Sequence, residues 1–488
     1  MNIKKIVLLL LAINAVLVLI PAIVFNLPIV QTDGASHYVY AKVYSETFSL
    51  DSENPEYNRM GSVEKKLSDY PPFVTIVFGS IIKMFGNDIF LINGGFGLAF
   101  FLLASIFMYI FIKDITKNNT VAIIGLAFFI LNIRAYYTLF TGIYPAFVSF
   151  CLSIPALYFS YKFFLSGNNR NLVLSLLFTC MTVFAYTIQG LYLIFLEIML
   201  WFGIKLEEKL SVHFPKINAR IKRISLSDFK NAIYLLIPTA LFLFFVIISF
   251  TLKGTTRETW LSGWFSGLMS TCTGYQCVWK HFFIVEGLIA LFAIFGSIYL
   301  FYKKDWKIIT LLLGGFLIVI SGSIFIEGEP TILVYIYRFY TTFSALLVIP
   351  ASVFIYKIIS MKEVRNIGIV FLALCIFIQL AILGYFYLNI GPAITQGEYD
   401  AASFLSGHTK SNILYVNNEV DEGTFRSFKW VVVFAKSEKY SVSESVGNLT
   451  GFDYVFVQDK DKLSADEKNK LGNNIAFNSG NAQVYKIA

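Results

Sequence analysis

The chain has 488 residues, of which 57% are hydrophobic and only 14% are charged, and its mean hydropathy is +0.67. Soluble proteins carry roughly 25% charged residues, so this composition excludes an ordinary soluble domain and predicts that most of the chain lies in lipid. The 12 Pro, 32 Gly and 5 Cys are too few for a disordered, collagen-like or disulfide-framework protein. The net charge of +8 lies in loops between apolar runs, so we expect a membrane partner and no nucleic acid.

Apolar runs predict about 11 transmembrane helices, an all-α polytopic membrane fold. The first run, Ile6 to Phe25, follows Lys4 and Lys5 and is long enough to cross the hydrocarbon once. No small-residue cleavage site follows it, so we expect an uncleaved helix with a cytoplasmic N-terminus. The further runs are 89–112, 119–138, 142–161, 171–187, 189–204, 231–252, 281–302, 308–326, 335–357 and 367–388.

The apolar segment Phe73 to Gly86 is too short for a confident crossing and contains Lys83, so we interpret it as a half-inserted or interfacial helix. With that choice the basic loops collect on one side, as the positive-inside rule requires of the cytoplasmic side. Counting the segment as a span would put the most basic stretch outside. The basic loops are Lys113/Lys117, Lys162/Arg170, the stretch 205–230, Lys303/Lys304/Lys307 and Lys357/Lys362/Arg365.

The same assignment of loops to the two sides of the membrane divides the chain into a membrane domain, 1–388, and an extracytoplasmic domain, 389–488. It makes 26–88 the first outer loop, with interfacial helices. The tail pattern predicts a small α/β domain. Its expected strands are 412–416, 454–457 and 482–487, and its expected helices are 398–406 and 464–471. We therefore expect a multi-pass protein of the cell (plasma) membrane.

The first outer loop opens with Gln31-Thr-Asp33-Gly34-Ala-Ser-His37. A carboxylate at the membrane face beside a flexible glycine could act as a general base on a substrate at the interface. The alternative is that Asp33 caps a helix starting at Ala35. His37 follows one turn later on the same helical face, where an interfacial polar residue is the simpler interpretation.

The loop closes with Tyr70-Pro71-Pro72-Phe73, whose two prolines fix the angle at which the short helix starts. Between the two motifs lie Asp51, Glu53 and Glu56. They could bind a divalent cation such as Mg or Mn, but no fixed ligand spacing is present, so a solvated acidic turn is favoured.

This layout resembles the GT-C superfamily of polyprenyl-phosphate-dependent glycosyltransferases. The likeness rests on Asp33, His37 and the Tyr70-Pro-Pro motif. The segment Thr141-Gly-Ile-Tyr144-Pro resembles, more weakly, an outer turn of related membrane proteins. It implies that Asp33 is the catalytic base. It also implies a polyprenyl-phosphate-sugar donor and a glycan, lipid or protein acceptor at the cell envelope. Relatives often have a second acidic residue beside the first, and a histidine where this chain has Gln189.

Outer-face cations could stabilise the departing phosphate, and Arg338 is the best placed because aromatic residues surround it in Tyr335-Ile-Tyr-Arg338-Phe-Tyr. It could instead snorkel to headgroups or pair with Glu327 or Glu329. The candidate substrate-binding residues are His37, Tyr70, Arg134, Tyr144, Gln189, Lys280, Glu327 and Arg338.

Cys272 and Cys277 lie in a predicted outer loop and either form a disulfide or stay free thiols; Cys151, Cys180 and Cys375 lie in apolar runs. The leading hypothesis is an inverting glycosyltransferase with Asp33 as base, taking a hexosyl or pentosyl group from the lipid donor. The alternatives are a transporter or flippase of lipid-linked saccharides, with Glu197 and Glu286 as its buried acids, and a membrane scaffold displaying the tail domain.

Overall fold

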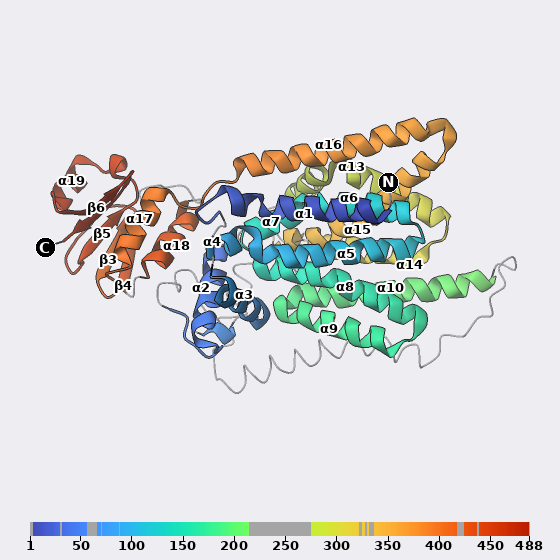
Figure 1. Ribbon diagram of the computed structural model, residues 1–488, viewed down its shortest axis with the longest axis horizontal. Coiled ribbons are helices and arrows are strands. Elements are labelled where there is room, and N and C mark those ends of the chain that lie inside the picture. Colours follow the sequence, from blue (N-terminus) through green and yellow to red (C-terminus); the bar gives the residue numbers. More distant parts are fainter. Residues whose placement is uncertain are drawn as a thin grey trace. The chain divides into compact units, whose positions relative to one another are not determined.

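A computed structural model describes residues 3–29, 32–55, 66–69, 71–86, 88–213, 275–321, 325–326, 329–330, 336–416, 424–436 and 439–487 (Figure 1). The chain forms two compact units. The first consists of Met1–Val18, Gly97–Thr138 and Pro145–Leu388, and the second of Leu19–Phe96, Leu139–Tyr144 and Asn389–Ala488.

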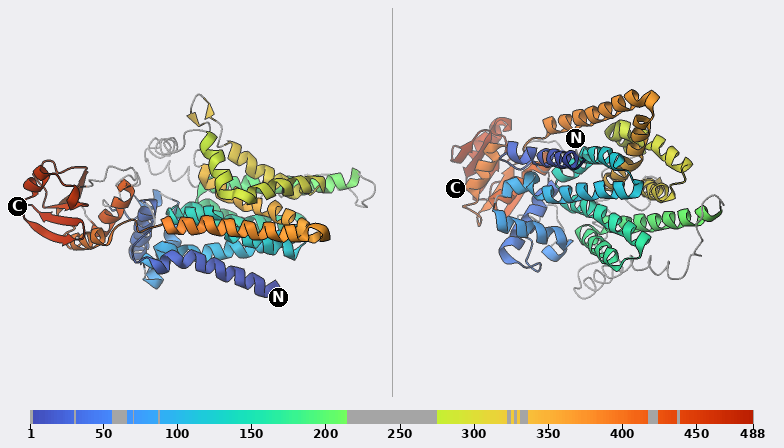
Figure 2. Two further views of the ribbon diagram at one scale, coloured as in Figure 1. Left: turned by 90° about the horizontal axis from the view of Figure 1, so that it is seen from above. Right: turned by 45° about the vertical axis from the view of Figure 1, so that its right-hand side comes forward.

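The first unit is a bundle of apolar helices that run side by side (Figure 2). Each predicted run outside 231–252 contains described helix, although 119–138 is divided between two helices and the end of 308–326 is a strand. The run 231–252 lies outside the described residues. Seven described helices are long and apolar enough to cross a membrane. All the described helices of the bundle, including those too short to be counted among the seven, are α1 (Ile3–Val24), α5 (Phe96–Thr116), α6 (Asn119–Ile130), α7 (Ile133–Phe140), α8 (Tyr144–Ser166), α9 (Asn169–Ala185), α10 (Thr187–His213), α13 (Tyr275–Tyr302), α14 (Trp306–Ser321), α15 (Ile336–Ser360) and α16 (Arg365–Asn389).

Small residues let these helices approach closely. A Cβ on Gly296 of α13 would lie 1.9 Å from the carbonyl oxygen of Pro350 in α15, and one on Gly203 of α10 would lie 2.7 Å from the carbonyl oxygen of Trp306 in α14. Lipid gives no hydrophobic drive between helices, so such close backbone packing is a main source of bundle stability. Short elements lie between the helices: β1 (Phe325–Ile326) and β2 (Glu329–Pro330) between α14 and α15, and η4 (Lys362–Val364) between α15 and α16.

The second unit contains the first predicted outer loop. Its helix α2 (Thr32–Thr47) packs on α3 (Pro72–Phe85), and a Cβ on Gly79 of α3 would lie 2.5 Å from the carbonyl oxygen of Ala41. The 14-residue α3 is the short helix expected at 73–86, and it begins at Pro72 directly after Pro71. The 3₁₀ turn η2 (Leu67–Asp69) precedes α3, and α4 (Asp88–Phe90) and the π-helical turn η3 (Leu91–Gly95) follow it.

The same unit holds a five-stranded α/β domain with strand order β4-β3-β5-β7-β6. β3 (Asn412–Val416) pairs in parallel with β4 (Lys439–Ser443) and β5 (Tyr454–Val457), while β7 (Ala482–Lys486) is antiparallel to β5 and β6 (Ile475–Ser479). Alternate residues, Leu414 and Val416 among them, pack with Leu471 of α19 (Ala465–Leu471). The remaining elements are α17 (Gln396–Leu405), α18 (Thr424–Ala435) and η5 (Lys460–Lys462).

The predicted fold class, a polytopic helical membrane protein with a small α/β domain, is therefore confirmed. The three expected strands are present as β3, β5 and β7, and the two expected helices as α17 and α19. The prediction missed α18 and the two outermost strands, β4 and β6, whose residues are all exposed or only partly buried.

Candidate functional site

Asp33 stands in the first turn of α2, and its side chain is exposed. The helix begins at Thr32, three residues before the start that the capping alternative required. Asp33 therefore lies inside the helix. The first turn of a helix leaves backbone amides without intrahelical acceptors, so the Asp33 carboxylate stands at the end of the helix where such donors are found.

Asn93 holds the segment that leads into α2. It is wholly buried in η3; its Oδ1 accepts from the Ile29 amide (3.0 Å), and its Nδ2 donates to the carbonyl oxygens of Leu27 (2.8 Å) and Phe25 (3.2 Å). The next residue, Gly94, has φ +142°, which favours glycine. The sequence analysis missed Asn93, whose only signal was the Asn-Gly-Gly run inside an apolar segment.

The turn before α8 lies against the start of α2. Gly142 has φ +79°, and a Cβ there would lie 2.4 Å from the amide nitrogen of Gly34 and 2.6 Å from its Cα. Tyr144 is fully buried, and its hydroxyl donates to the carbonyl oxygen of Ile92 (2.9 Å). The structure thus brings together two motifs that the sequence analysis treated separately, and the Tyr144 hydroxyl binds the backbone of η3.

His37 lies one turn after Asp33 and is 7% exposed. Its ring centroid lies 6.2 Å from those of Tyr40 and Tyr144. The imidazole is thus packed among aromatic rings behind the turn that carries Asp33.

Helix α18 of the α/β domain contacts the other end of this turn. Lys429 donates to the hydroxyl of Ser36, and the Trp430 ring lies 5.8 Å from that of Tyr38. The Tyr38 hydroxyl and the Lys42 ammonium both bind Asp88 Oδ2, each at 2.9 Å. Helix α2 is therefore held by side chains of α4 and α18, and neither Lys429 nor Asp88 was among the predicted site residues.

Two predicted substrate-binding residues belong to the first unit. Arg134 is half-buried near the start of α7, where its amide donates to Asn132 Oδ1 (3.0 Å). Gln189 is buried in α10, and its Nε2 donates to the Thr342 hydroxyl of α15. The remaining predictions cannot be placed: Tyr70, Glu327 and Cys272 lie outside the described residues, as do the side chains of Lys280, Arg338, Cys277 and Glu286.

The acidic turn does not present a set of free ligands. Asp51 forms an ion pair with Lys66 (3.7 Å), and the backbone of Lys66 pairs with that of Glu53. Glu56 lies outside the described part of the chain. Among the residues that the structure describes, no three His, Cys, Asp or Glu side chains gather as a metal site would need. Cys151, Cys180 and Cys375 are free thiols packed within the bundle.

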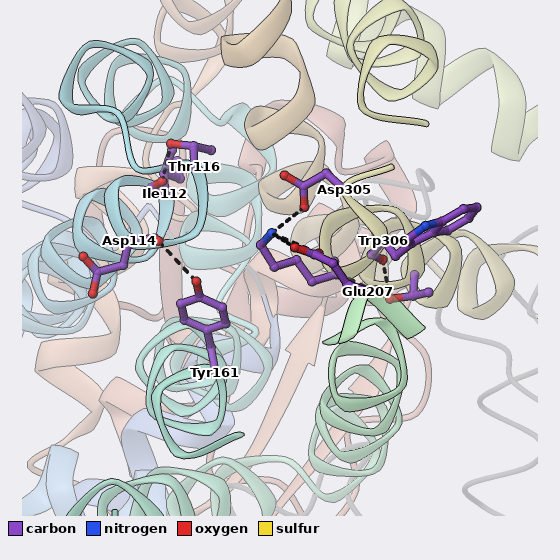
Figure 3. A network of polar contacts seen from close by, with 9 residues as sticks. Ile112, Asp114, Thr116, Tyr161, Glu207, Asp305 and Trp306 are labelled. Carbon is purple, nitrogen blue, oxygen red and sulfur yellow. Dashed lines mark hydrogen bonds and ion pairs between the residues drawn. The ribbon is translucent and has the colours of Figure 1, made fainter. Parts of the chain in front are cut away.

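Two polar clusters join helices of the bundle. Glu197 of α10 is fully buried and accepts from the hydroxyls of Ser160 (2.6 Å) and Thr179 (3.2 Å). Elsewhere Lys307 binds Asp305 (2.9 Å) and both carboxylate oxygens of Glu207 (3.1 Å), joining α14 to α10 (Figure 3).

The fold of this chain is similar to those of ArnT and of the arabinofuranosyltransferase AftD. The crystal structure of ArnT from Cupriavidus metallidurans bound to undecaprenyl phosphate matches with a TM-score of 0.57 and 10% identity, over 98% of this chain and 97% of that one. The crystal structure of ArnT from Cupriavidus metallidurans in the apo state matches with a TM-score of 0.57 and 10% identity, over 99% of this chain and 97% of that one. The arabinofuranosyltransferase AftD from Mycobacteria matches with a TM-score of 0.58 and 11% identity, over 93% of this chain and 36% of AftD. No family model and no curated sequence matches the chain.

Proposed function

We propose that this protein is a membrane glycosyltransferase that moves a sugar from a polyprenyl-phosphate-linked donor to an acceptor hydroxyl. The fold is shared over the full length with ArnT, which was crystallised with undecaprenyl phosphate. The observation that carries the proposal is Asp33, an exposed carboxylate on a helix whose start is fixed by Asn93 and Gly142. A catalytic base needs this combination of access and fixed position.

In the proposed reaction Asp33 accepts the proton of the acceptor hydroxyl. The acceptor oxygen attacks the anomeric carbon from the side opposite the phosphate, so a new glycosidic bond forms with inversion. The bond from the anomeric carbon to the phosphate oxygen breaks, and the polyprenyl phosphate leaves with the bonding electrons. Asp33 then releases its proton to water. Arg338, Lys280 and Arg134 are the candidate cations for the leaving phosphate, where charge stabilisation matters most.

The proposed orientation has the N-terminus in the cytoplasm, and Asp33 and the α/β domain outside, in the cell membrane. It rests on the distribution of Lys and Arg among the loops. The donor tail then stays in lipid while its phosphate and sugar meet the acceptor at the outer interface. The transferred group is a hexosyl or pentosyl unit, and the acceptor is a glycan, lipid or protein.

Transport of a lipid-linked saccharide is the second candidate, because Glu197 is a buried carboxyl within a span. Its contacts with Ser160 and Thr179 also serve helix packing.

One reconstitution separates the two candidates. Purified protein in liposomes is given a panel of undecaprenyl-phosphate-linked sugars, and both donor cleavage and donor sidedness are followed. A transferase releases undecaprenyl phosphate and yields a glycosylated product. Movement of intact donor between leaflets without cleavage, abolished by Glu197→Gln, would instead establish transport.

A further inference from the structure

Helix α18 carries a lysine in an unusual environment. Lys429 is 4% exposed, although lysine is almost never buried to this extent unless its ammonium is bound. The ammonium donates to the hydroxyl of Ser36 on α2, a residue 393 positions away in sequence. A hydrogen bond from a charged donor is stronger than one between neutral groups, so this bond favours a fixed geometry.

The next residue of α18 reinforces the contact. Trp430 is fully buried, with its ring 5.8 Å from that of Tyr38 and stacked on Phe434 at 5.5 Å. The Tyr38 hydroxyl in turn binds Asp88 of α4. Consecutive residues of α18 therefore reach α2 at two points two residues apart, one by a hydrogen bond and one by ring packing.

The position of Ser36 on α2 relates this contact to the proposed site. Residues three and four apart lie on one helical face, so Ser36 and His37 share the face of Asp33 one turn further along. A shift of Ser36 therefore moves the helical turn that directly follows the one with the Asp33 carboxylate. The α/β domain is thus in direct contact with the helix on which the proposed chemistry depends.

We propose that Lys429 is a positioning residue for Asp33, and that the C-terminal α/β domain contributes to catalysis through it. The inference rests on the proposed role of Asp33. Lys429 does not touch substrate: it fixes the first turns of α2, so that Asp33 meets the acceptor hydroxyl in one orientation. Its loss lowers turnover and leaves donor affinity in place.

The test compares full-length Lys429→Met, Lys429→Arg and Lys436→Met. Methionine keeps an apolar stem and removes the donor, arginine keeps the charge and the donor, and Lys436 is an exposed lysine directly after the same helix. Hydrogen exchange over residues 32–47 and the kcat and KM for an undecaprenyl-phosphate-linked sugar are measured. Ser36→Ala removes the same bond from the other helix and serves if Lys429→Met does not fold.

We expect faster exchange in the first turns of α2 and a kcat lowered about 10-fold to 100-fold in Lys429→Met, with donor KM nearly unchanged. Lys429→Arg recovers much of the rate, and Lys436→Met behaves as the wild type. Unchanged exchange, an unchanged kcat, or a loss confined to KM would overturn the proposal. If the wild type transfers no sugar from any donor, the proposed function fails, and hydrogen exchange alone decides whether Lys429 holds α2.

Discussion

Gly142 lies backbone against backbone with Gly34: a Cβ on Gly142 would come within 2.4 Å of the Gly34 amide nitrogen. The two glycines belong to turns more than a hundred residues apart. Their contact requires a residue without a side chain at position 142, both for space and for its left-handed φ of +79°. The position of Asp33, next to Gly34, therefore depends on a glycine in a different loop.

Replacing Gly142 by alanine should displace the start of α2 and destabilise the protein by about 1–3 kcal/mol. Gly167→Ala is the matched control, since Gly167 also has a left-handed φ (+65°) but no atom within 4 Å of its added Cβ. Gly167→Ala therefore introduces the strain of a left-handed φ without a steric clash. Thermal unfolding in detergent measures the difference, and equal losses in the two variants would show that the Gly34 contact is unimportant.

Asn93→Ala should loosen the segment before α2. The change leaves the amide of Ile29 and the carbonyl oxygens of Leu27 and Phe25 without their side-chain partner. Each buried polar group left unsatisfied costs about 1–3 kcal/mol. We expect a clear fall in melting temperature and faster exchange over residues 25–29. Asn118→Ala, which removes only the N-cap of α6, should cost about 1 kcal/mol and leave that segment protected.

The Lys307 cluster should contribute more than the ordinary ion pairs of the surface. Its side chain is 14% exposed and faces two carboxylates, so Lys307→Met leaves Glu207 and Asp305 without their shared cation. After allowance for the partial exposure of Glu207, we expect a loss of about 1–3 kcal/mol. Glu208→Gln breaks the more exposed Lys205 pair and should change stability by less than about 1 kcal/mol. Comparable melting temperatures for both variants would contradict this ranking.

The α/β domain should lose stability in acid through Glu467. Hydrogen bonds from the amides of Val446 (2.9 Å) and Ser464 (2.8 Å) lower the pKa of this carboxyl in the folded state. A lowered folded pKa means that the stabilisation is present above the unfolded value, about 4.3, and is lost as pH falls through the folded value. The protection factor of the Val446 amide, its exchange relative to an unprotected amide at the same pH, should therefore fall between pH 6 and 3 in the wild type. Glu467→Gln should be less protected at pH 6 and less sensitive to pH, and an equal pH response in both proteins would refute the assignment.

The sequence predicted those parts of the fold that rest on local pattern. The apolar runs anticipated the described bundle helices, and the hydrophobic strands β3 and β5 were predicted with their exact bounds. Helix α18 was missed because its Val431–Val433 run has the composition of a strand, although these residues are buried on a helix.

The candidate site was predicted only in its local part. Asp33 and His37 follow one another on a short motif, whereas Asn93 and Lys429 act on backbone or side chains 64 and 393 residues away. A single sequence contains no periodicity that links such pairs. The membrane orientation and the substrate-binding roles of Tyr144 and Gln189 stay predictions.

Single-turnover sugar transfer by Asp33→Asn shows directly whether Asp33 is the catalytic base. Asp51→Asn is the control, since Asp51 is an exposed acid of the same predicted loop, paired with Lys66. At saturating undecaprenyl-phosphate-linked donor and acceptor, Asp33→Asn should transfer about 10²-fold to 10⁴-fold more slowly than the wild type. Binding of undecaprenyl phosphate and the melting temperature should be unchanged, and Asp51→Asn should keep the wild-type rate. Transfer by Asp33→Asn at the wild-type rate would show that Asp33 is not the catalytic base.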